Sequence, residues 1–303
     1  MEKTFYSNGK LLITGEYLVL DGAKALALPT KFGQNLIVEK TGNKEIKWKS
    51  HDADGSVWFE DTIPFSEIIS TTPFEKESVK NTLITILREA YRLNTDVILK
   101  SEGYTVSTRL SFPKKWGLGT SSTLINNIAQ WFNINAFTLL KNSFGGSGYD
   151  IACAQNDCPI LYHLEQGKPI VEKVNFHPTF TENLYFVYLN QKQNSKNAIA
   201  SYKEKKNNLD DAKEIIDQLT ETVLNAKDEN TFAQALEKHE KELSSILETK
   251  TVKESLFPDF EGTIKSLGAW GGDFVLAISK ENPSPYFISK GFETIIPYIE
   301  MIL

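Results

Sequence analysis

The stretch Pro113–Thr123, PKKWGLGTSST, decides the fold, because it combines two glycines with a run of hydroxyl residues. Gly117 and Gly119 suit a turn in which the backbone approaches a ligand closely or adopts a positive φ. The hydroxyl residues 120–122 are good caps for the apolar helix that the following residues predict. A glycine turn that leads into a helix N-terminus binds anions, since free N–H groups and the helix dipole point the same way. These residues alone favour a phosphate-binding turn and an ordinary capped loop equally.

The residues on both sides place this turn between a strand and a helix. In residues 104–112, the apolar side chains of Val106, Leu110 and Phe112 alternate with polar ones, which is typical of a half-buried strand. After the turn, the apolar run over residues 124–132 predicts a helix. The order is therefore strand, glycine turn, helix.

The rest of the chain predicts a strand-rich first half and long, charged helices in the second. Further strands are predicted at residues 10–14, 17–20, 25–28, 34–40, 45–50, 56–60, 160–164, 184–190 and 274–278. Helices are predicted over residues 75–92, 151–156 and 195–247. The Asp21-Gly22 pair predicts a hairpin. Glycine and proline between residues 165 and 183 interrupt the regular pattern and predict a domain boundary there.

Composition limits the class of protein and its ligands. The chain has 303 residues, with 41% hydrophobic and 24% charged side chains, which predicts a globular protein of one large or two ordinary domains. The net charge of −6 excludes a general attraction to nucleic acid or to anionic membranes. An anionic ligand must therefore be held by local lysines and backbone N–H groups. Cys153 and Cys158 give no disulfide framework, and no signal-peptide pattern or membrane span is present, so we expect a cytoplasmic protein.

Several common catalytic motifs are missing from the sequence. The GxxxxGK[ST] string of a Walker-type loop is absent, and the glycine turn lacks the third glycine of a dinucleotide fingerprint. No GxSxG elbow supports hydrolase chemistry. The histidines form no metal-binding spacing, so we expect all of them to be structural or solvated: His51, His163, His177 and His239.

Two further glycine-rich segments carry a carboxylate each. Residues 142–155, NSFGGSGYDIACAQ, contain Asp150, and residues 266–273, SLGAWGGD, end in Asp273 before an apolar strand. Near the N-terminus, Lys10 lies close to Gly15-Glu16. Phosphoryl transfer needs such parts, because backbone N–H groups cradle the phosphates, a cation neutralises developing charge and a carboxylate receives the hydroxyl proton.

Four segments, in this order, resemble the motifs of the galactokinase–homoserine kinase–mevalonate kinase–phosphomevalonate kinase superfamily, the GHMP kinases. They are SNGKLLITGEYLVLDGAKALALP (7–29), PKKWGLGTSST (113–123), GSGYDIA (146–152) and SLGAWGGDF (266–274). The resemblance covers nearly the whole chain, and it is greatest to the phosphomevalonate and mevalonate kinases. It implies an α+β fold of two domains, with ATP and substrate meeting between them. Residues 1–170 would form a ribosomal protein S5 domain 2-like domain, and residues 171–303 a ferredoxin-like domain.

The resemblance also implies residues for ATP, metal and catalysis. The ATP-binding residues would be Pro113, Gly117, Leu118, Gly119, Thr120, Ser121 and Ser122, and Ser121 would also contact Mg²⁺. Asp150 would be the catalytic base, and Lys10 would pair with it and steady the transferring group. The alternatives are that Asp150 caps the helix after it, and that Lys10 is an ordinary solvated lysine.

A further set of residues would bind the substrate. The set is Glu16, Tyr17, Ser147, Gly148, Tyr149, Lys192, Ser195, Lys196, Gly268, Gly271, Gly272 and Asp273. Two alternatives stay open: Glu16 and Tyr17 hold the first turn, and Asp273 is a turn residue.

Two departures from the family pattern affect the predicted site. Residues 123–149 contain no Asp or Glu, although many family members supply a magnesium-binding glutamate from this interval. Magnesium would then be held by Ser121, water and ATP, or by another carboxylate, or the catalyst is weakened. Trp270 stands where a small residue is usual, and we expect it to narrow the nucleotide or substrate entrance.

The resemblance predicts an ATP- and Mg²⁺-dependent kinase of the mevalonate pathway of isoprenoid biosynthesis. The acceptor would be mevalonate or phosphomevalonate, and the protein a monomer or homodimer with no nucleic-acid or membrane partner. One alternative is a diphosphomevalonate decarboxylase-like enzyme of the same fold. The other is a non-catalytic ligand-binding relative.

Overall fold

The computed structural model describes residues 2–74, 76, 78–191, 200, 202–204, 210–270 and 272–303, and its chain divides into two compact units. Unit 1 comprises Met1–Gly9, Phe32–Lys114 and Leu118–Gln155, and unit 2 comprises Lys10–Lys31, Lys115–Gly117 and Asn156–Leu303. Three segments contribute residues to both units: β1 (Glu2–Leu12), β2 (Ala25–Lys40) and the glycine-rich stretch. A division into domains 1–170 and 171–303 stays a prediction.

The strands of unit 1 form a mixed sheet. Its order is β4 (Val57–Pro64), β3 (Glu45–His51), β5 (Tyr104–Leu110) and the C-terminal part of β2. β3 runs parallel to β5, whereas the other two pairings are antiparallel. Along β5, Val106, Thr108 and Leu110 are buried and Arg109 is exposed, so the predicted half-buried strand before the glycine turn is confirmed.

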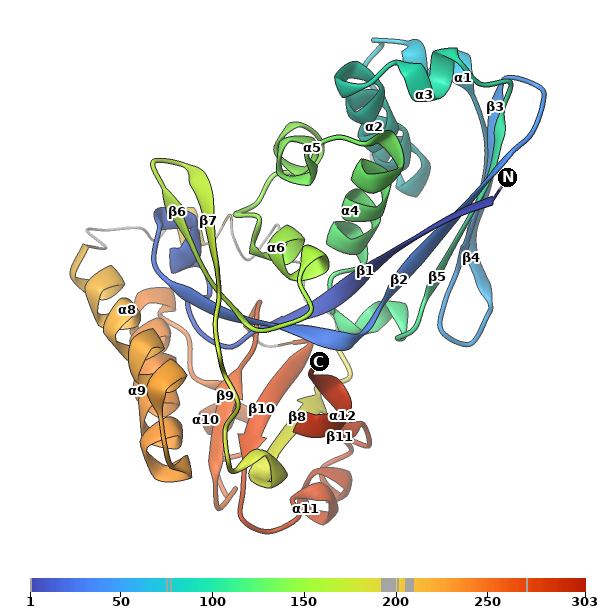
Figure 1. Cartoon of the computed structure of the whole chain (residues 1–303). Coiled ribbons are helices and arrows are strands. Elements are labelled where there is room, and N and C mark those ends of the chain that lie inside the picture. The colour runs from blue at the N-terminus through green and yellow to red at the C-terminus, as the bar shows by residue number, and fades with distance from the viewer. Residues whose placement is uncertain are drawn as a thin grey trace. The chain divides into compact units, whose positions relative to one another are not determined.

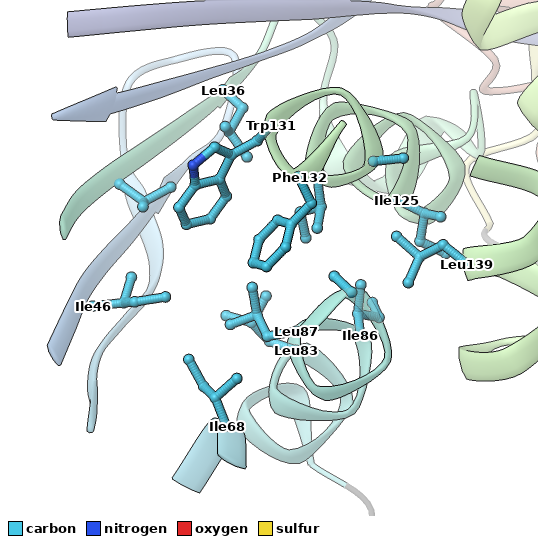
Figure 2. Packing of buried hydrophobic residues seen from close by; sticks show 14 of the residues in the cluster. Leu36, Ile46, Ile68, Leu83, Ile86, Leu87, Ile125, Trp131, Phe132 and Leu139 are labelled. Carbon is cyan, nitrogen blue, oxygen red and sulfur yellow. The ribbon is translucent and has the colours of Figure 1, made fainter. Parts of the chain in front are cut away.

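Helices α1 (Phe65–Ile69), α2 (Val79–Leu93), α4 (Thr120–Phe132) and α5 (Ala136–Ser143) build the core of unit 1 with this sheet. Figure 2 shows Trp131 and Phe132 of α4 against Leu83 and Leu87 of α2. Two short helices, α3 (Asp96–Leu99) and α6 (Tyr149–Gln155), complete the unit. The core therefore fixes α4, and with it the glycine turn at its N-terminus.

Unit 2 contains a hairpin and a second sheet. The N-terminal part of β2 pairs with β6 (Ile160–Glu165), and β6 forms an antiparallel hairpin with β7 (Lys168–Lys173). Gln166 and Gly167 make the hairpin turn with φ values of 51° and 74°. The interrupted pattern at this point thus marks a tight turn. The second sheet is antiparallel, in the order β11 (Ile295–Pro297), β8 (Leu184–Tyr188), β10 (Phe274–Ile278) and β9 (Thr263–Ser266).

Two long helices of unit 2, α8 (Asp210–Asn225) and α9 (Glu229–Leu247), lie side by side (Figure 1). Shorter helices of this unit include α10 (Val252–Leu256), α11 (Ser284–Ser289), α12 (Tyr298–Met301) and η3 (Thr181–Asn183). Among the described residues, no helix has the length and the apolar character that crossing a membrane requires.

Two sequence-based predictions of elements are wrong. The sequence predicts a strand over residues 17–20, but Leu18–Asp21 form the 3-10 helix η1, and Gly22 ends it with a φ of 88° instead of turning a hairpin. By contrast, the long helices that the sequence predicts over residues 195–247 are present in the described part of that range as α8 and α9, and Asp228 starts α9 as its N-cap by accepting a hydrogen bond from Thr231 N.

Candidate functional site

The glycine-rich stretch enters α4 through two positive-φ glycines. Before it, Lys114–Trp116 form the 3-10 helix η2. Gly117 has a φ of 70° and Gly119 a φ of 99°, values that a side chain with a Cβ rarely adopts. α4 begins at Thr120, and its N-cap is Gly119, with no side chain accepting from the first turn. The hydroxyl side chains of residues 120–122 therefore do not cap α4, because these residues lie inside its first turn.

The hydroxyl groups of this turn have different surroundings. Ser122 Oγ donates to the Gly119 carbonyl at 2.9 Å, and Thr123 Oγ1 donates to Gln34 Oε1 at 2.7 Å. Thr120 Oγ1 is buried and has no hydrogen-bond partner among the described residues, and Ser121 is exposed. No acidic residue lies in the first turn of α4. The arrangement suits an anion, which the helix dipole and a buried hydroxyl would both favour.

Asp150 lies in the first turn of α6. This helix begins at Tyr149, directly after Gly148, whose φ is 97°. Asp150 is the second helical residue, so it does not occupy the capping position of the alternative interpretation. Ser147, Tyr149 and Asp150 are half-buried, and Gly148 is buried.

A chain of uncharged side chains joins α6 to α4, and sequence reasoning missed it; all of its members are buried except Gln155, which is exposed. Gln155 Nε2 donates to Asn126 Oδ1 at 3.0 Å, and Asn126 Nδ2 donates to Ser7 Oγ at 2.9 Å. Ser7 Oγ donates to Asn127 Oδ1 at 2.8 Å, and Asn127 Nδ2 donates to the Gln34 carbonyl at 2.9 Å. Buried amides are costly unless they are hydrogen-bonded. Two adjacent asparagines in an apolar helix were the signal in the sequence.

Within unit 2, residues of three predicted motifs meet. Lys10 Nζ donates to the Gly117 carbonyl at 3.2 Å. A Cβ on Gly117 would lie 2.2 Å from Asp273 Cγ, so the Asp273 carboxyl group packs directly on this glycine. Asp273 adopts a φ of 54°, and its amide donates to the Gln191 carbonyl at 2.7 Å. A lysine and a carboxyl group thus flank one glycine of the predicted phosphate-binding turn.

Glu16 lies inside unit 2, where it forms an ion pair with Lys265. Its side chain is 1% exposed and that of Lys265 is 0% exposed. Lys265 Nζ is also 3.2 Å from Glu240 Oε2, and His239 Nε2 accepts from Gly15 N at 2.9 Å. A carboxylate so deeply buried is out of reach of a ligand, which favours the second interpretation of Glu16, that it holds the first turn.

Burial and neighbouring charges shift the pKa values of this cluster. Burial raises the pKa of Glu16 to about 7, although the ammonium group of Lys265 opposes this. Burial lowers the pKa of Lys265, but the charges of Glu16 and Glu240 outweigh it, so the pKa is raised from the usual value. Burial, with the charge of Lys265, holds the pKa of His239 well below its usual value. His239 is therefore neutral, and we assign it a structural role.

Tyr17 follows Glu16 in a strained backbone conformation. Its φ is 62° and its ψ is −52°, and Leu18 N donates to the Glu16 carbonyl at 2.7 Å, which makes a tight three-residue γ-turn. The Tyr17 hydroxyl accepts from Trp270 N at 3.1 Å, and its ring centroid lies 5.5 Å from that of Tyr202.

The remaining predicted residues divide between the units or lie outside the described residues. Gly268 has a φ of 73°, and Gly272 is buried in unit 2. Lys192, Ser195, Lys196 and Gly271 lie outside the described residues. Asp150 belongs to unit 1 and Lys10 to unit 2, and their pairing stays a prediction. Among the described residues, no group of three or more His, Cys, Asp or Glu side chains is placed to hold a metal ion.

Solved structures of small-molecule kinases resemble the chain over nearly its full length. Mevalonate kinase of Methanococcus jannaschii matches with a TM-score of 0.71 and 17% identity, over 98% of this chain and 97% of that one. Phosphomevalonate kinase of Streptococcus pneumoniae, in complex with phosphomevalonate and AMPPNP, matches with a TM-score of 0.70 and 16% identity, over 97% and 99%. The chain has the GHMP kinase fold.

Galactokinase of Lactococcus lactis, complexed with galactose, shares this GHMP kinase fold with a TM-score of 0.64 and 13% identity, over 95% of this chain and 88% of that one. No protein-family model matches the sequence, and no curated protein matches it significantly. The GHMP kinase fold that the four motifs predict is confirmed by the three-dimensional comparison, although overall identity to these structures is low.

Proposed function

We propose that the chain is an ATP-dependent kinase of the mevalonate pathway, which transfers the γ-phosphoryl group of ATP to mevalonate or phosphomevalonate. The observation that carries this proposal is the meeting of Lys10, Gly117 and Asp273, one from each of three motifs, within unit 2 of a chain with the GHMP kinase fold. Because phosphoryl transfer depends mainly on positioning and charge neutralisation, a lysine beside a phosphate-binding turn is a part that it requires.

The proposed site for the ATP phosphates is the N-terminus of α4. Its cap is a positive-φ glycine with no capping side chain, and its first turn contains no acidic residue. The buried hydroxyl of Thr120 has no partner among the described residues, and a phosphate oxygen would satisfy it. A chain with a net charge of −6 has no general affinity for nucleotides, so such local groups must supply the attraction.

The residues of this turn also fit Mg²⁺ in the manner usual for phosphoryl transfer. Mg²⁺ is held by few protein groups when it binds with a nucleotide, because phosphates and water provide most of its ligands. Ser121, exposed in the first turn of α4, is the proposed protein ligand. Bound Mg²⁺ supplies neutralisation of charge on the phosphate oxygens.

Asp150 is the proposed acceptor of the proton from the acceptor hydroxyl, and Lys10 the proposed cation that offsets charge on the transferring group. Asp150 is held by a short helix whose last residue is anchored to α4 through Asn126. The anionic acceptor group would be held by lysines, for which Lys192 and Lys196 are the candidates from the sequence. Mevalonate and phosphomevalonate are preferred because kinases named for them are among the similar structures.

The test is ADP release with mevalonate, phosphomevalonate, diphosphomevalonate, galactose and homoserine in parallel, with Mg²⁺ and ATP present. We expect ADP release that depends on mevalonate or phosphomevalonate. Release of carbon dioxide from diphosphomevalonate would instead identify a decarboxylase. No turnover with any of these acceptors would contradict the proposal and favour the non-catalytic relative.

A further inference from the structure

Three charged side chains form a continuous ion-pair cluster in the interior of unit 2. Glu16 is 1% exposed, Lys265 is 0% exposed and Glu240 is 3% exposed. Charged groups are rarely buried, because the loss of hydration exceeds the attraction between them unless every hydrogen bond is made. Replacing such clusters by apolar residues is often neutral or stabilising. A cluster of this kind therefore calls for a role beyond stability.

The hydrogen bonds of the cluster join three separate elements. Lys265 Nζ, from β9, contacts Glu16, lies 3.2 Å from Glu240 Oε2 of α9 and donates to the Ser266 carbonyl at 2.5 Å. Ser266 Oγ donates to Glu240 Oε1 at 2.6 Å. His239, also on α9, accepts from Gly15 N, so α9 and β9 together hold the turn that contains Glu16.

The turn that the cluster holds is strained. Tyr17, next to Glu16, has a positive φ and forms the centre of a γ-turn, a conformation that non-glycine residues adopt only when their surroundings impose it. Its hydroxyl accepts from the backbone amide of Trp270. Trp270 itself is buried in a cluster with Leu18 and Tyr202. The strained turn and the third glycine-rich turn are thus fastened to each other.

The third glycine-rich turn, residues 266–273, is held at its start and in its middle. At its start, Ser266 is bound by Glu240, and in its middle, Trp270 N is bound by Tyr17. Leu267 N donates to the Phe274 carbonyl at 3.2 Å and closes the turn. Asp273, one residue before Phe274, is the carboxylate that packs on Gly117.

We propose that Glu16, Lys265 and Glu240 are positioning residues, which hold the Tyr17 turn against the Trp270 amide and thereby place Asp273 beside Gly117. This inference rests on the proposed function, because it gives the cluster a purpose in phosphoryl transfer. It also assigns Trp270 a role other than narrowing the nucleotide or substrate entrance. The backbone amide of Trp270 is the point at which the third glycine-rich turn is joined to the Tyr17 turn. The three charged side chains would thus act through the turns that they hold and not through contact with substrate.

The experiment compares the wild type with a variant that carries Glu16→Gln, Lys265→Met and Glu240→Gln together. The three changes keep side-chain size and remove all charge, so no unpaired buried charge is left to unfold the protein. Lys290→Met is the matched control, because it removes a lysine from the Lys290–Asp259 ion pair in the same unit, where both side chains are substantially exposed. Thermal unfolding, hydrogen exchange and steady-state kinetics are measured on all three proteins.

We expect the triple variant to unfold at a temperature close to that of the wild type. The backbone amides of Gly15, Leu18 and Trp270 should exchange about tenfold faster or more in this variant. The two turns can then open locally without the free-energy cost of breaking the buried ion pairs. The kcat of the variant should fall about 10- to 100-fold, since small displacements of a site are costly, while the KM for ATP changes little. The Lys290→Met variant should match the wild type in exchange and in kinetics.

Wild-type exchange at these amides in the triple variant would overturn the proposal, whether or not the protein is a kinase. Faster exchange with unchanged kcat would also overturn it, because the cluster would then hold the turns without serving the reaction. If the wild type transfers no phosphoryl group to any acceptor, the proposed function fails. The exchange comparison would then still decide whether the cluster fastens the two turns.

Discussion

Asp150 is the residue on which the proposed chemistry depends most. It lies in the first turn of α6 instead of at the capping position, so its carboxylate is not needed to start the helix. Asp150→Asn keeps the size and most of the hydrogen-bonding capacity of the side chain but removes the proton acceptor. We expect kcat to fall about 100- to 10,000-fold, the usual contribution of a general base. ATP affinity, measured by titration calorimetry, should stay nearly constant. Turnover close to that of the wild type would reject Asp150 as the base.

At Gly117, the lack of space for a Cβ atom should be enough to make activity depend on glycine. A Cβ at this position would lie 2.2 Å from Asp273 Cγ, and the φ of 70° is unfavourable for alanine. Gly167→Ala is a matched control, because Gly167 has a φ of 74°, yet a Cβ there would meet nothing within 4 Å beyond its chain neighbours. Both variants should lose about 1–2 kcal/mol of unfolding free energy from the backbone.

Only Gly117→Ala should lose more unfolding free energy than this backbone contribution, because Asp273 must move to admit the new methyl group. For the same reason, only Gly117→Ala should lose phosphoryl transfer. Urea unfolding and ADP release would measure the two effects. Equal losses of stability in the two variants, with activity retained in both, would contradict the close packing of Asp273 on Gly117.

At the scale of elements, the sequence was most informative where a pattern is repeated. The alternation in β5 and the glycine turn before α4 were predictable, because their side-chain period and their backbone conformation leave signals in the residues themselves. The 3-10 helix η1 was not predictable, since a short apolar run fits a strand equally well. The turn just before it contains Glu16, whose buried ion pair with Lys265 joins residues far apart in the chain.

In the candidate site, too, local features could be predicted from the sequence and tertiary contacts could not. Glycine turns and their carboxylates are local features and were found, whereas partners across the fold were not. Lys265 and Glu240 occur in stretches that resemble any charged helix or short strand, so nothing local indicated that they are buried. The contact of Asp273 with Gly117 likewise depends on tertiary structure.

The N-terminus of α4 allows a test that separates helix stability from anion binding. Ser121 is exposed in the first turn, where a negative charge stabilises a helix by about 0.3–1 kcal/mol. Ser121→Asp should therefore leave the unliganded protein as stable as the wild type or slightly more stable. The same charge should repel the phosphates of ATP and abolish the stabilisation that Mg²⁺-ATP gives the folded protein. For the wild type this stabilisation reaches about 2.7 kcal/mol when the ATP concentration is 100 times the Kd.

Ser121→Ala is the control for this change, because it removes the hydroxyl without adding charge. It should keep most of the ATP-dependent shift in Tm, measured by differential scanning fluorimetry across an ATP titration. A full ATP-dependent shift in Ser121→Asp would show that the phosphates bind elsewhere.

At the scale of the whole molecule, the buried cluster links folding to pH. The pKa of Glu16 is raised to about 7 in the folded protein, above its usual value of 4.5, so the folded state holds this proton more tightly than the unfolded state. The stability that this proton contributes is complete below pH 4.5 and is lost as the pH rises toward 7. Across that window the loss amounts to about 3 kcal/mol.

Glu16→Gln removes this titration, so the free energy of unfolding of the wild type relative to the variant should fall as the pH rises from 4.5 to 7. The groups that face Glu16 do not obscure the comparison. Lys265, whose pKa is raised, stays charged throughout, and His239, whose pKa is lowered, affects both proteins alike. Urea unfolding at several pH values measures the difference. Parallel stability curves for the two proteins would mean that Glu16 stays ionised in the interior, held by Lys265 alone.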